Sequence, residues 1–251
     1  MRLIVGAPVA FRDWALPYWF ERLAAQTRRP DGFVFVHSGP VDDATWRELY
    51  AGAARHSLPV PTVIHDDAWP HTRHDNARFE TLARLRNRLL ATVCDTDTDL
   101  LLSLDTDIML EDPRTIERLE ELVLAGSADI AQPVAFLHPQ APAVWQPGDE
   151  VCWAYNFGWL QPYAPSRMAL RRPHVDSLAW GETLAIDVPM ACWLGNRAAM
   201  ACRYAPHESG EDIGFAQDLQ AAGVHAVADT SLYAFHAWDE RHLASQLAVA
   251  Q

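Results

Sequence analysis

Short apolar runs alternate with amphipathic segments through the first half of the chain. The apolar runs predict strands at residues 3–7, 32–37, 60–65 and 130–136, and a further one in the run 100–110, which Asp105 and Asp107 interrupt. Segments with apolar positions three or four residues apart predict helices at residues 14–26, 44–56, 79–93 and 113–124. Strands that alternate with helices at this pitch indicate βαβ units around a mostly parallel sheet flanked by helices. We therefore expect an α/β fold.

The second half of the chain is less regular. Residues 138–188 are rich in proline and tryptophan and follow no clear period. An apolar run at 188–194, a helix at 212–222 and a strand at 226–235 come after them. No repeat or linker separates the halves, so we expect one domain over residues 1–251, with a smaller mixed half that begins near residue 136.

Charge and composition narrow the range of partners. The chain has 20 basic and 33 acidic residues, a formal net charge of −13, and every basic residue is an arginine. This balance opposes nucleic acid as a partner, and the missing lysine excludes Schiff-base and P-loop chemistry. No apolar run reaches the roughly 20 residues of a membrane span. The four cysteines form no CxxC pair and indicate free thiols in a reducing compartment, so we expect a cytoplasmic protein.

Two carboxylates follow the most apolar run of the chain. Asp105 and Asp107 close the segment LLLSL, and Thr106 stands between them. Carboxylates do not remain unpaired in an apolar core, and ligands of open α/β sheets bind at the carboxyl ends of the strands. The pair can hold Mg²⁺ or Mn²⁺ there, although it can also mark a turn or cap the helix near Pro113.

The segment ARLRN at residues 83–87, followed by a helix and LLLSLDTD, resembles the nucleotide half of GT-A glycosyltransferases. By this resemblance Asp107 is a metal ligand and Asp105 contacts the metal or the ribose of a nucleotide-sugar. Arg86 would face the nucleotide or diphosphate, and Asp66 or Asp67 would lie by the base. Pro8 and Thr106, at the ends of the first and fourth strands, complete the implied nucleotide-sugar site.

Two later features are similar to motifs of the same family. Glu211 and Asp212 open a predicted helix, where acidic residues are also favoured as caps. Many inverting GT-A enzymes place such a pair beneath the acceptor, where one carboxylate acts as the base; we favour Asp212 over Glu211. His236 follows the last predicted strand and resembles the third protein ligand of the metal, although a lone histidine is often simply packed. An imidazole ligand suits Mn²⁺ better than Mg²⁺.

Aromatic residues gather in the irregular segment. Five of the ten tryptophans lie between residues 141 and 194: Trp145, Trp153, Trp159, Trp180 and Trp193. Aromatic faces stack on sugars, although each ring could equally fill a core. We expect Asn156, Trp159 and Trp193 to line an acceptor pocket.

Together these features predict a metal-dependent glycosyltransferase, with a nucleotide-sugar half at residues 1–135 and an acceptor half at residues 136–251. It would use Mn²⁺ or Mg²⁺ to transfer a hexose from a UDP- or GDP-sugar to a carbohydrate or another hydroxyl-bearing acceptor. The alternatives are a haloacid-dehalogenase-like phosphohydrolase, a sugar nucleotidyltransferase, and a binding protein with a degenerate site. The sequence does not distinguish inversion from retention.

Overall fold

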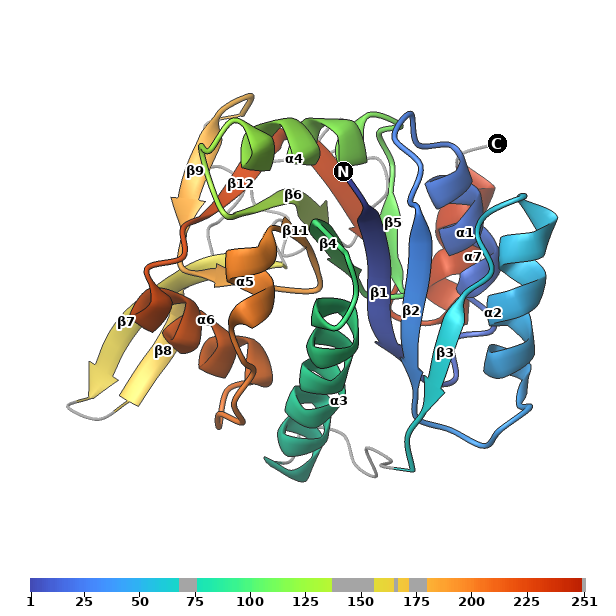
Figure 1. Ribbon diagram of the computed structural model, residues 1–251, viewed down its shortest axis with the longest axis horizontal. Helices are drawn as coiled ribbons and strands as arrows, with labels where there is room; N and C mark the ends of the chain where they lie inside the picture. Colours follow the sequence, from blue (N-terminus) through green and yellow to red (C-terminus); the bar gives the residue numbers. More distant parts are fainter. Residues whose placement is uncertain (68–75, 137–155, 165–166, 172–179, 250–251) are drawn as a thin grey trace.

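The computed structural model describes residues 1–67, 76–136, 156–164, 167–171 and 180–249. Its main sheet has nine strands in the order β3-β2-β1-β4-β11-β6-β12-β5, with β9 also paired to β12 (Figure 1). The strands are β1 (Leu3–Val9), β2 (Gly32–His37), β3 (Thr62–His65), β4 (Leu100–Leu104), β5 (Ile108–Leu110), β6 (Ile130–Phe136), β9 (Thr183–Ile186), β11 (Cys192–Gly195) and β12 (Ala226–His236). The expected mostly parallel α/β sheet is confirmed.

The strand directions are mixed on one side of the sheet. The pairs β1–β2, β2–β3, β1–β4 and β6–β12 are parallel. Strand β11 lies antiparallel between β4 and β6, and β5 and β9 run antiparallel to β12. The carboxyl ends of β1 to β4 therefore lie at one edge of the sheet.

Helices cover both faces of the sheet. They are α1 (Leu16–Ala24), α2 (Ala44–Arg55), α3 (Asn76–Cys94), α4 (Thr115–Leu124), α5 (Arg197–Ala201), α6 (Glu211–Ala222) and α7 (Glu240–Val249). Alternate residues of each strand enter two separate cores, as the period of a strand requires. In β1, Leu3 and Val5 join the core that α1, α2 and α4 contribute to, whereas Ile4 joins the core of α3, α5 and α6.

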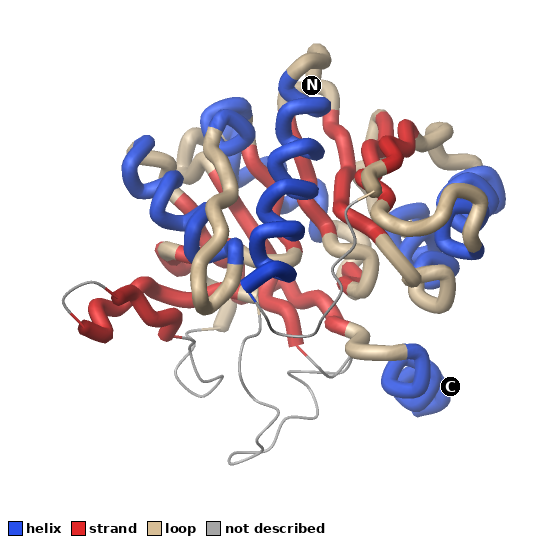
Figure 2. Tube along the Cα trace, turned by 90° about the horizontal axis from the view of Figure 1, so that it is seen from below, coloured by secondary structure: helices blue, strands red, loops and turns tan. Residues whose placement is uncertain are grey.

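A second sheet extends from the main one. It has the order β10-β7-β8, from β7 (Phe157–Ala164), β8 (Arg167–Arg171) and β10 (Val188–Pro189), and all its pairs are antiparallel. Seen from below in Figure 2, β7 and β8 project beyond the body of the molecule. This sheet lies within the predicted smaller half.

Two apolar runs of the sequence each form two strands in the structure. Residues 100–110 form β4 and β5, separated by the turn at Asp105–Asp107, where Ile108 N donates to Asp105 O over 2.9 Å. Residues 188–195 form β10 and β11, separated at Ala191, whose φ is +58°. Each break redirects the chain to a different neighbouring strand.

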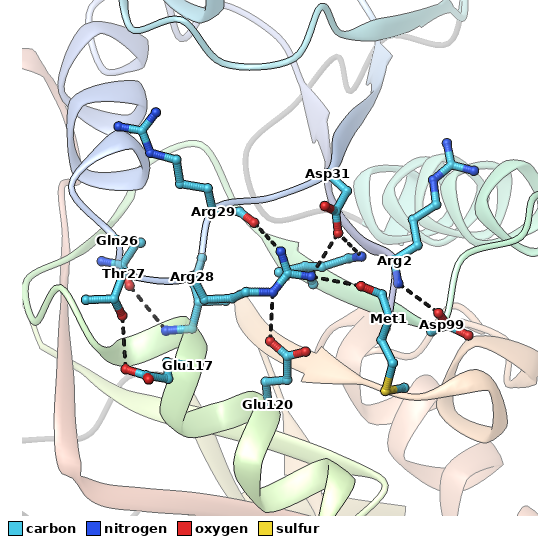
Figure 3. Close-up of polar contacts among 12 residues, drawn as sticks. Met1, Arg2, Gln26, Thr27, Arg28, Arg29, Asp31, Asp99, Glu117 and Glu120 are labelled. Atoms are coloured by element: carbon cyan, nitrogen blue, oxygen red, sulfur yellow. Dashed lines mark hydrogen bonds and ion pairs between the residues drawn. The ribbon is translucent and has the colours of Figure 1, made fainter.

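The amino-terminal ends of the strands are tied together by Arg28 (Figure 3). Its Nε donates to Glu120 Oε2 over 2.9 Å, and its Nη2 donates to Asp31 Oδ2 over 2.8 Å and to the backbone oxygen of Met1 over 3.0 Å. Asp31 Oδ2 also accepts from the backbone N of Leu3. This edge is opposite to the one at which β1 to β4 end.

No helix within the described ranges is long and apolar enough to cross a membrane.

Candidate functional site

Five segments that are distant in the sequence converge at the carboxyl ends of β4 and β12. The turn Asp105–Asp107 leaves β4, His236 ends β12, and Glu211 begins α6. Arg86 comes from α3, and Arg12 follows β1. Strand β12 pairs with β5 so that His236 lies opposite Ile108, and Ala237 N donates to Asp107 O over 2.8 Å. The end of β12 is thereby held against the acidic turn.

Arg86 binds carboxylates on both sides of the site. Its Nη1 and Nη2 donate to Asp105 Oδ1 and Oδ2 over 2.9 and 3.0 Å, and its Nε donates to Glu211 Oε1 over 3.1 Å. The Arg86 and Glu211 side chains are only 7% and 5% exposed, and Asp105 is 24% exposed. The resemblance implied that Arg86 faces the nucleotide or diphosphate. In the structure its guanidinium is paired with two protein carboxylates, which its planar fork fits well.

An aromatic layer covers the Arg86 guanidinium. The carbon at its centre lies 5.5 Å from the Tyr204 ring, within cation–π range. The Tyr204 ring stacks on Phe215 at 4.1 Å and accepts a hydrogen bond at its hydroxyl from Trp193 Nε1. Burial by itself would lower the pKa of Arg86, but the acidic groups around it, Asp105 foremost and Asp212 among them, raise that pKa well above its usual value.

Asp107 lies between the guanidinium of Arg12 and the imidazole of His236. Arg12 Nε and Nη2 are 3.2 and 3.1 Å from its Oδ2, and His236 Nε2 is 3.8 Å from its Oδ1. Burial would raise the pKa of Asp107, but His236 and Arg12 outweigh burial and lower the pKa to about 2. The Asp107 carboxylate is therefore ionised at neutral pH.

The expected three-residue metal site is not assembled. No group of three His, Cys, Asp or Glu side chains in the described part of the chain is arranged to hold a metal ion. Asp107 and His236 lie close together, whereas the Asp105 carboxylate is turned to Arg86. Two side chains alone would hold a divalent cation only together with ligands from substrate phosphates and water, as is common for Mg²⁺.

Glu211 and Asp212 differ in their surroundings. Both belong to the first turn of α6, after Gly210, whose φ of +125° favours glycine. Glu211 is buried and bound to Arg86, whereas Asp212 is half-buried. The Glu211 carboxylate is therefore occupied by Arg86.

The two acidic residues after β3 have separate environments. Asp66 is buried, and both its oxygens accept from Arg84, with Arg88 bound to Oδ2 as well. Asp67 is 98% exposed and pairs with His65. The Asp66 carboxylate is thus occupied by two arginines of α3 and does not lie open to a base.

Pro8 lies near the carboxyl end of β1, and Thr106 follows the end of β4. Pro8 is half-buried in β1, next to Val36 of β2, and Thr106 is buried within the acidic turn. Their contact with a nucleotide-sugar stays a prediction.

Two of the three residues expected in an acceptor pocket are buried and bonded within the protein. Asn156 accepts from Ala135 N and donates to Pro133 O, so its amide supports β6. Trp193 packs in the α3–α6 core, stacked on Phe215. Neither side chain is exposed for an acceptor to contact.

Trp159 of β7 is half-buried, and its Nε1 donates to Ala185 O over 3.0 Å. Trp145 and Trp153 lie outside the described residues.

Arg12 and Tyr204 were not predicted as part of the site from the sequence. Arg12 stands four residues after Pro8, just beyond the end of β1, and strand-end position was the signal that pointed to its neighbours. Tyr204 gave no such signal, because its role depends on stacking against α6.

Three solved structures share this arrangement of strands and helices. The mannosyltransferase PcManGT from Pyrobaculum calidifontis, in complex with GDP-Man and Mn²⁺, superposes with a TM-score of 0.59 at 12% identity, over 99% of this chain and 64% of that chain. S. aureus TarS 1-349 in complex with UDP-GlcNAc gives 0.57 at 14% identity, over 97% and 61%. Glucosyl-3-phosphoglycerate synthase from Mycobacterium tuberculosis, in complex with Mn²⁺, UDP and glucosyl-3-phosphoglycerate, gives 0.50 at 12% identity, over 99% and 79%.

No family model and no curated protein matches the sequence. The chain spans less than two thirds of the TarS fragment and of the mannosyltransferase. Because the sequence identities are only 12–14%, the similarity to these structures concerns the fold alone. On that ground, the chain has the fold of the GT-A glycosyltransferase superfamily.

Proposed function

We propose that this protein is a glycosyltransferase that moves a hexose from a UDP- or GDP-sugar to a carbohydrate or another hydroxyl-bearing acceptor. The observation that carries the proposal is the convergence of Asp105, Asp107, Glu211 and His236 at the carboxyl ends of β4 and β12. Ligands of open α/β sheets bind at this edge. The nucleotide-sugars in the complexes of PcManGT and TarS support this class of donor.

We assign Asp107 and His236 to a divalent cation, with Mn²⁺ favoured over Mg²⁺ because one ligand is an imidazole. When bound, the cation would neutralise negative charge on the donor diphosphate. Mn²⁺ is present in the complexes of PcManGT and the synthase. Asp105 uses two of its acceptor positions for Arg86, and an ionised carboxylate has about four. It can still accept from a ribose hydroxyl, which remains our proposal for it.

Asp212 is our proposed general base. In an inverting transfer the acceptor oxygen would bond to the anomeric carbon as the bond from that carbon to the diphosphate oxygen breaks. Asp212 would take the proton of the acceptor hydroxyl, and the nucleoside diphosphate would leave. Glu211, held by Arg86, would support the start of α6 instead.

The acceptor side is proposed for the region of Trp159. Its ring is half-buried on β7, next to Phe157 at 6.2 Å, and it retains surface that a sugar could contact.

The other functions have less support. A haloacid-dehalogenase-like phosphohydrolase usually relies on a lysine, which this chain lacks, and its acidic pair follows the first strand rather than β4. A sugar nucleotidyltransferase would need a glycine-rich basic loop after β1, where Arg12 is the one basic residue between Pro8 and Tyr18. A binding protein with a degenerate site remains a second candidate, and turnover separates it from an enzyme.

Thermal unfolding with UDP or GDP, each with and without Mn²⁺, tests the proposal. A ligand at about 100 times its Kd stabilises a protein by about 2.7 kcal/mol, so binding should raise Tm by several degrees. We expect the nucleotide with Mn²⁺ to give the largest shift. Asp107→Ala should abolish the Mn²⁺-dependent part of that shift, whereas Asp95→Ala, at an exposed position after α3, should not.

Turnover is followed as release of UDP from UDP-GlcNAc or GDP from GDP-mannose with candidate acceptors. Asp212→Asn should keep nucleotide binding and lower turnover by about 100-fold or more, the range of general-base catalysis. Binding without turnover of either donor in the native protein would favour the degenerate binding protein. No stabilisation by either nucleotide, with or without Mn²⁺, would contradict both.

A further inference from the structure

We infer that Arg86 is a positioning residue, which joins the donor-side Asp105 to the acceptor-side Glu211 and does not bind the donor phosphates. The inference rests on the proposed function, because it assigns the two sides of the site to donor and acceptor. It replaces the phosphate-binding role that the family resemblance implied for this arginine.

The first ground is the use of the guanidinium. Both terminal nitrogens bind one Asp105 oxygen each, and Nε binds Glu211, at distances between 2.9 and 3.1 Å. A guanidinium has five N–H groups in one plane, so three are engaged along the two edges that carboxylates use. With a side chain only 7% exposed, Arg86 has little surface left for a phosphate.

The second ground is the aromatic face. Tyr204 covers the guanidinium and is itself packed on Phe215 of α6. The backbone of Tyr204 is fixed by the next residue of α3, since Asn87 Nδ2 donates to Tyr204 O and Tyr204 N donates to Asn87 Oδ1, each over 2.8 Å. Two consecutive residues of α3 therefore hold the chain that leads into α6.

The third ground is the charge balance. The Arg86 guanidinium faces Asp105 and Glu211 directly, and Asp212 is near enough to raise its pKa. Without Arg86, the carboxylates would repel one another in a site that excludes much of the solvent, and removing one partner of a buried ion pair is strongly destabilising. Because Glu211 immediately precedes Asp212, this ion pair determines where the proposed base lies.

Lysine cannot replace Arg86 in this role. An ammonium group keeps the positive charge but has no planar fork, so it cannot bind both Asp105 oxygens and Glu211 at once. Arg86→Lys should therefore displace the start of α6 while leaving the site's net charge unchanged. A displacement of about 1 Å can reduce a rate by about 100-fold.

The experiment compares Arg86→Lys with Arg28→Lys. Arg28 is a matched control, because it also binds two carboxylates, Asp31 and Glu120, but at the opposite edge of the sheet (Figure 3). For each variant we would measure Tm, the Kd of UDP and of GDP with Mn²⁺ by calorimetry, and kcat for donor consumption. We expect Arg86→Lys to lower kcat about 100-fold, with each Kd changed less than about 3-fold. Arg28→Lys should change Tm alone.

Two results would overturn the inference. A Kd for UDP or GDP weakened tenfold or more in Arg86→Lys, with kcat unchanged at saturating donor, would make Arg86 a phosphate ligand. An Arg86→Lys variant that changes only Tm, as Arg28→Lys should, would make it a merely structural residue.

A stability cycle keeps the inference separate from the proposed function. If the native protein consumes no donor, the proposed function fails, but Arg86→Met, Glu211→Gln and the double variant can still be compared by urea unfolding. We expect the double variant to be more stable than Arg86→Met, because Glu211→Gln removes the buried charge left without its partner. Additive effects would show that Arg86 and Glu211 are not coupled, and would overturn the inference on their own.

Discussion

At the scale of single residues, the partners of the Arg86 side chain could not be predicted from the sequence. The motif placed Arg86 near Asp105, and the structure shows the two side chains in direct contact. Its carboxylate partners lie 19 and 125 residues away, so neither spacing nor residue type could show that the guanidinium faces protein acids. The positions of Asn156 and Trp193 were harder still to predict. In an irregular segment, the sequence does not distinguish a polar or aromatic residue in the core from one that lines a pocket.

His37 is a second buried residue whose charge matters. It ends β2, its ring is fully buried, and Trp46 packs edge-on against it at 5.3 Å. Its Nε2 lies 3.3 Å from Asp43 Oδ1, and the ring of His65 is 6.2 Å away. Burial outweighs the attraction of Asp43 and lowers the pKa of His37. The folded protein therefore holds this ring in its neutral form.

The pH dependence of unfolding follows from that shift. A histidine whose folded pKa is below its unfolded value of about 6.5 contributes stability above pH 6.5 and loses it as the pH falls toward the folded pKa. Between pH 7.5 and 5.5 we expect the free energy of unfolding to fall, and to fall less in His37→Gln. Urea unfolding at both pH values measures this. His225→Gln, at an exposed ring, is the control, and an equal pH dependence in all three proteins would contradict the assignment.

At the scale of elements, local patterns identified most helices and strands but not their neighbours. The βα order of the first half was correct because it depends on short-range periodicity. The interruption of the apolar run 100–110 at Asp105 and Asp107 could be predicted, but no local feature shows that β5 leaves β4 to pair with β12, more than a hundred residues later. The insertion of β11 between β4 and β6 likewise depends on contacts across the whole chain.

The position of α6 depends on one glycine. A Cβ added to Gly214 would lie 2.0 Å from the backbone oxygen of Ala205, an atom that cannot move as a side chain can. Overpacking costs about 1–3 kcal/mol in well-packed interiors, and a backbone clash belongs at the upper end. Gly214→Ala should therefore displace the helix that carries Glu211 and Asp212.

Gly223→Ala is the matched control. Gly223 caps the other end of α6 with a φ of +69°, and a Cβ added to it would have no atom within 4 Å. Its cost should be about 1–2 kcal/mol, the price of a left-handed alanine. By urea unfolding we expect Gly214→Ala to lose more stability than Gly223→Ala, and donor consumption to fall only in the former. Equal turnover in the two variants would show that the site tolerates movement of α6.

At the scale of the whole molecule, the acidic surplus acts on anything that approaches. The formal net charge of −13 creates a negative long-range field, whereas the arginines near the site act only at short range. That field opposes nucleic acid, as the composition indicated, but it opposes a free nucleoside diphosphate too. A cation bound to the diphosphate would remove most of that repulsion, because it cancels much of the ligand's own charge.

The association of a metal-free nucleoside diphosphate with this protein should therefore become faster as the salt concentration rises. Raising the ionic strength from 0.01 M to 0.15 M shortens the Debye length from about 30 Å to about 8 Å and screens the field. We expect the association rate constant of UDP or GDP without metal to rise about 2- to 10-fold over that range. For a protein whose net charge attracts phosphates, the same rate constant would fall with salt. With Mn²⁺ the rise should be smaller, since the complex carries less charge. Stopped-flow mixing with a fluorescent nucleotide analogue measures both. A rate constant that falls with salt would mean that arginines close to the site, Arg12 among them, outweigh the charge of the rest of the molecule.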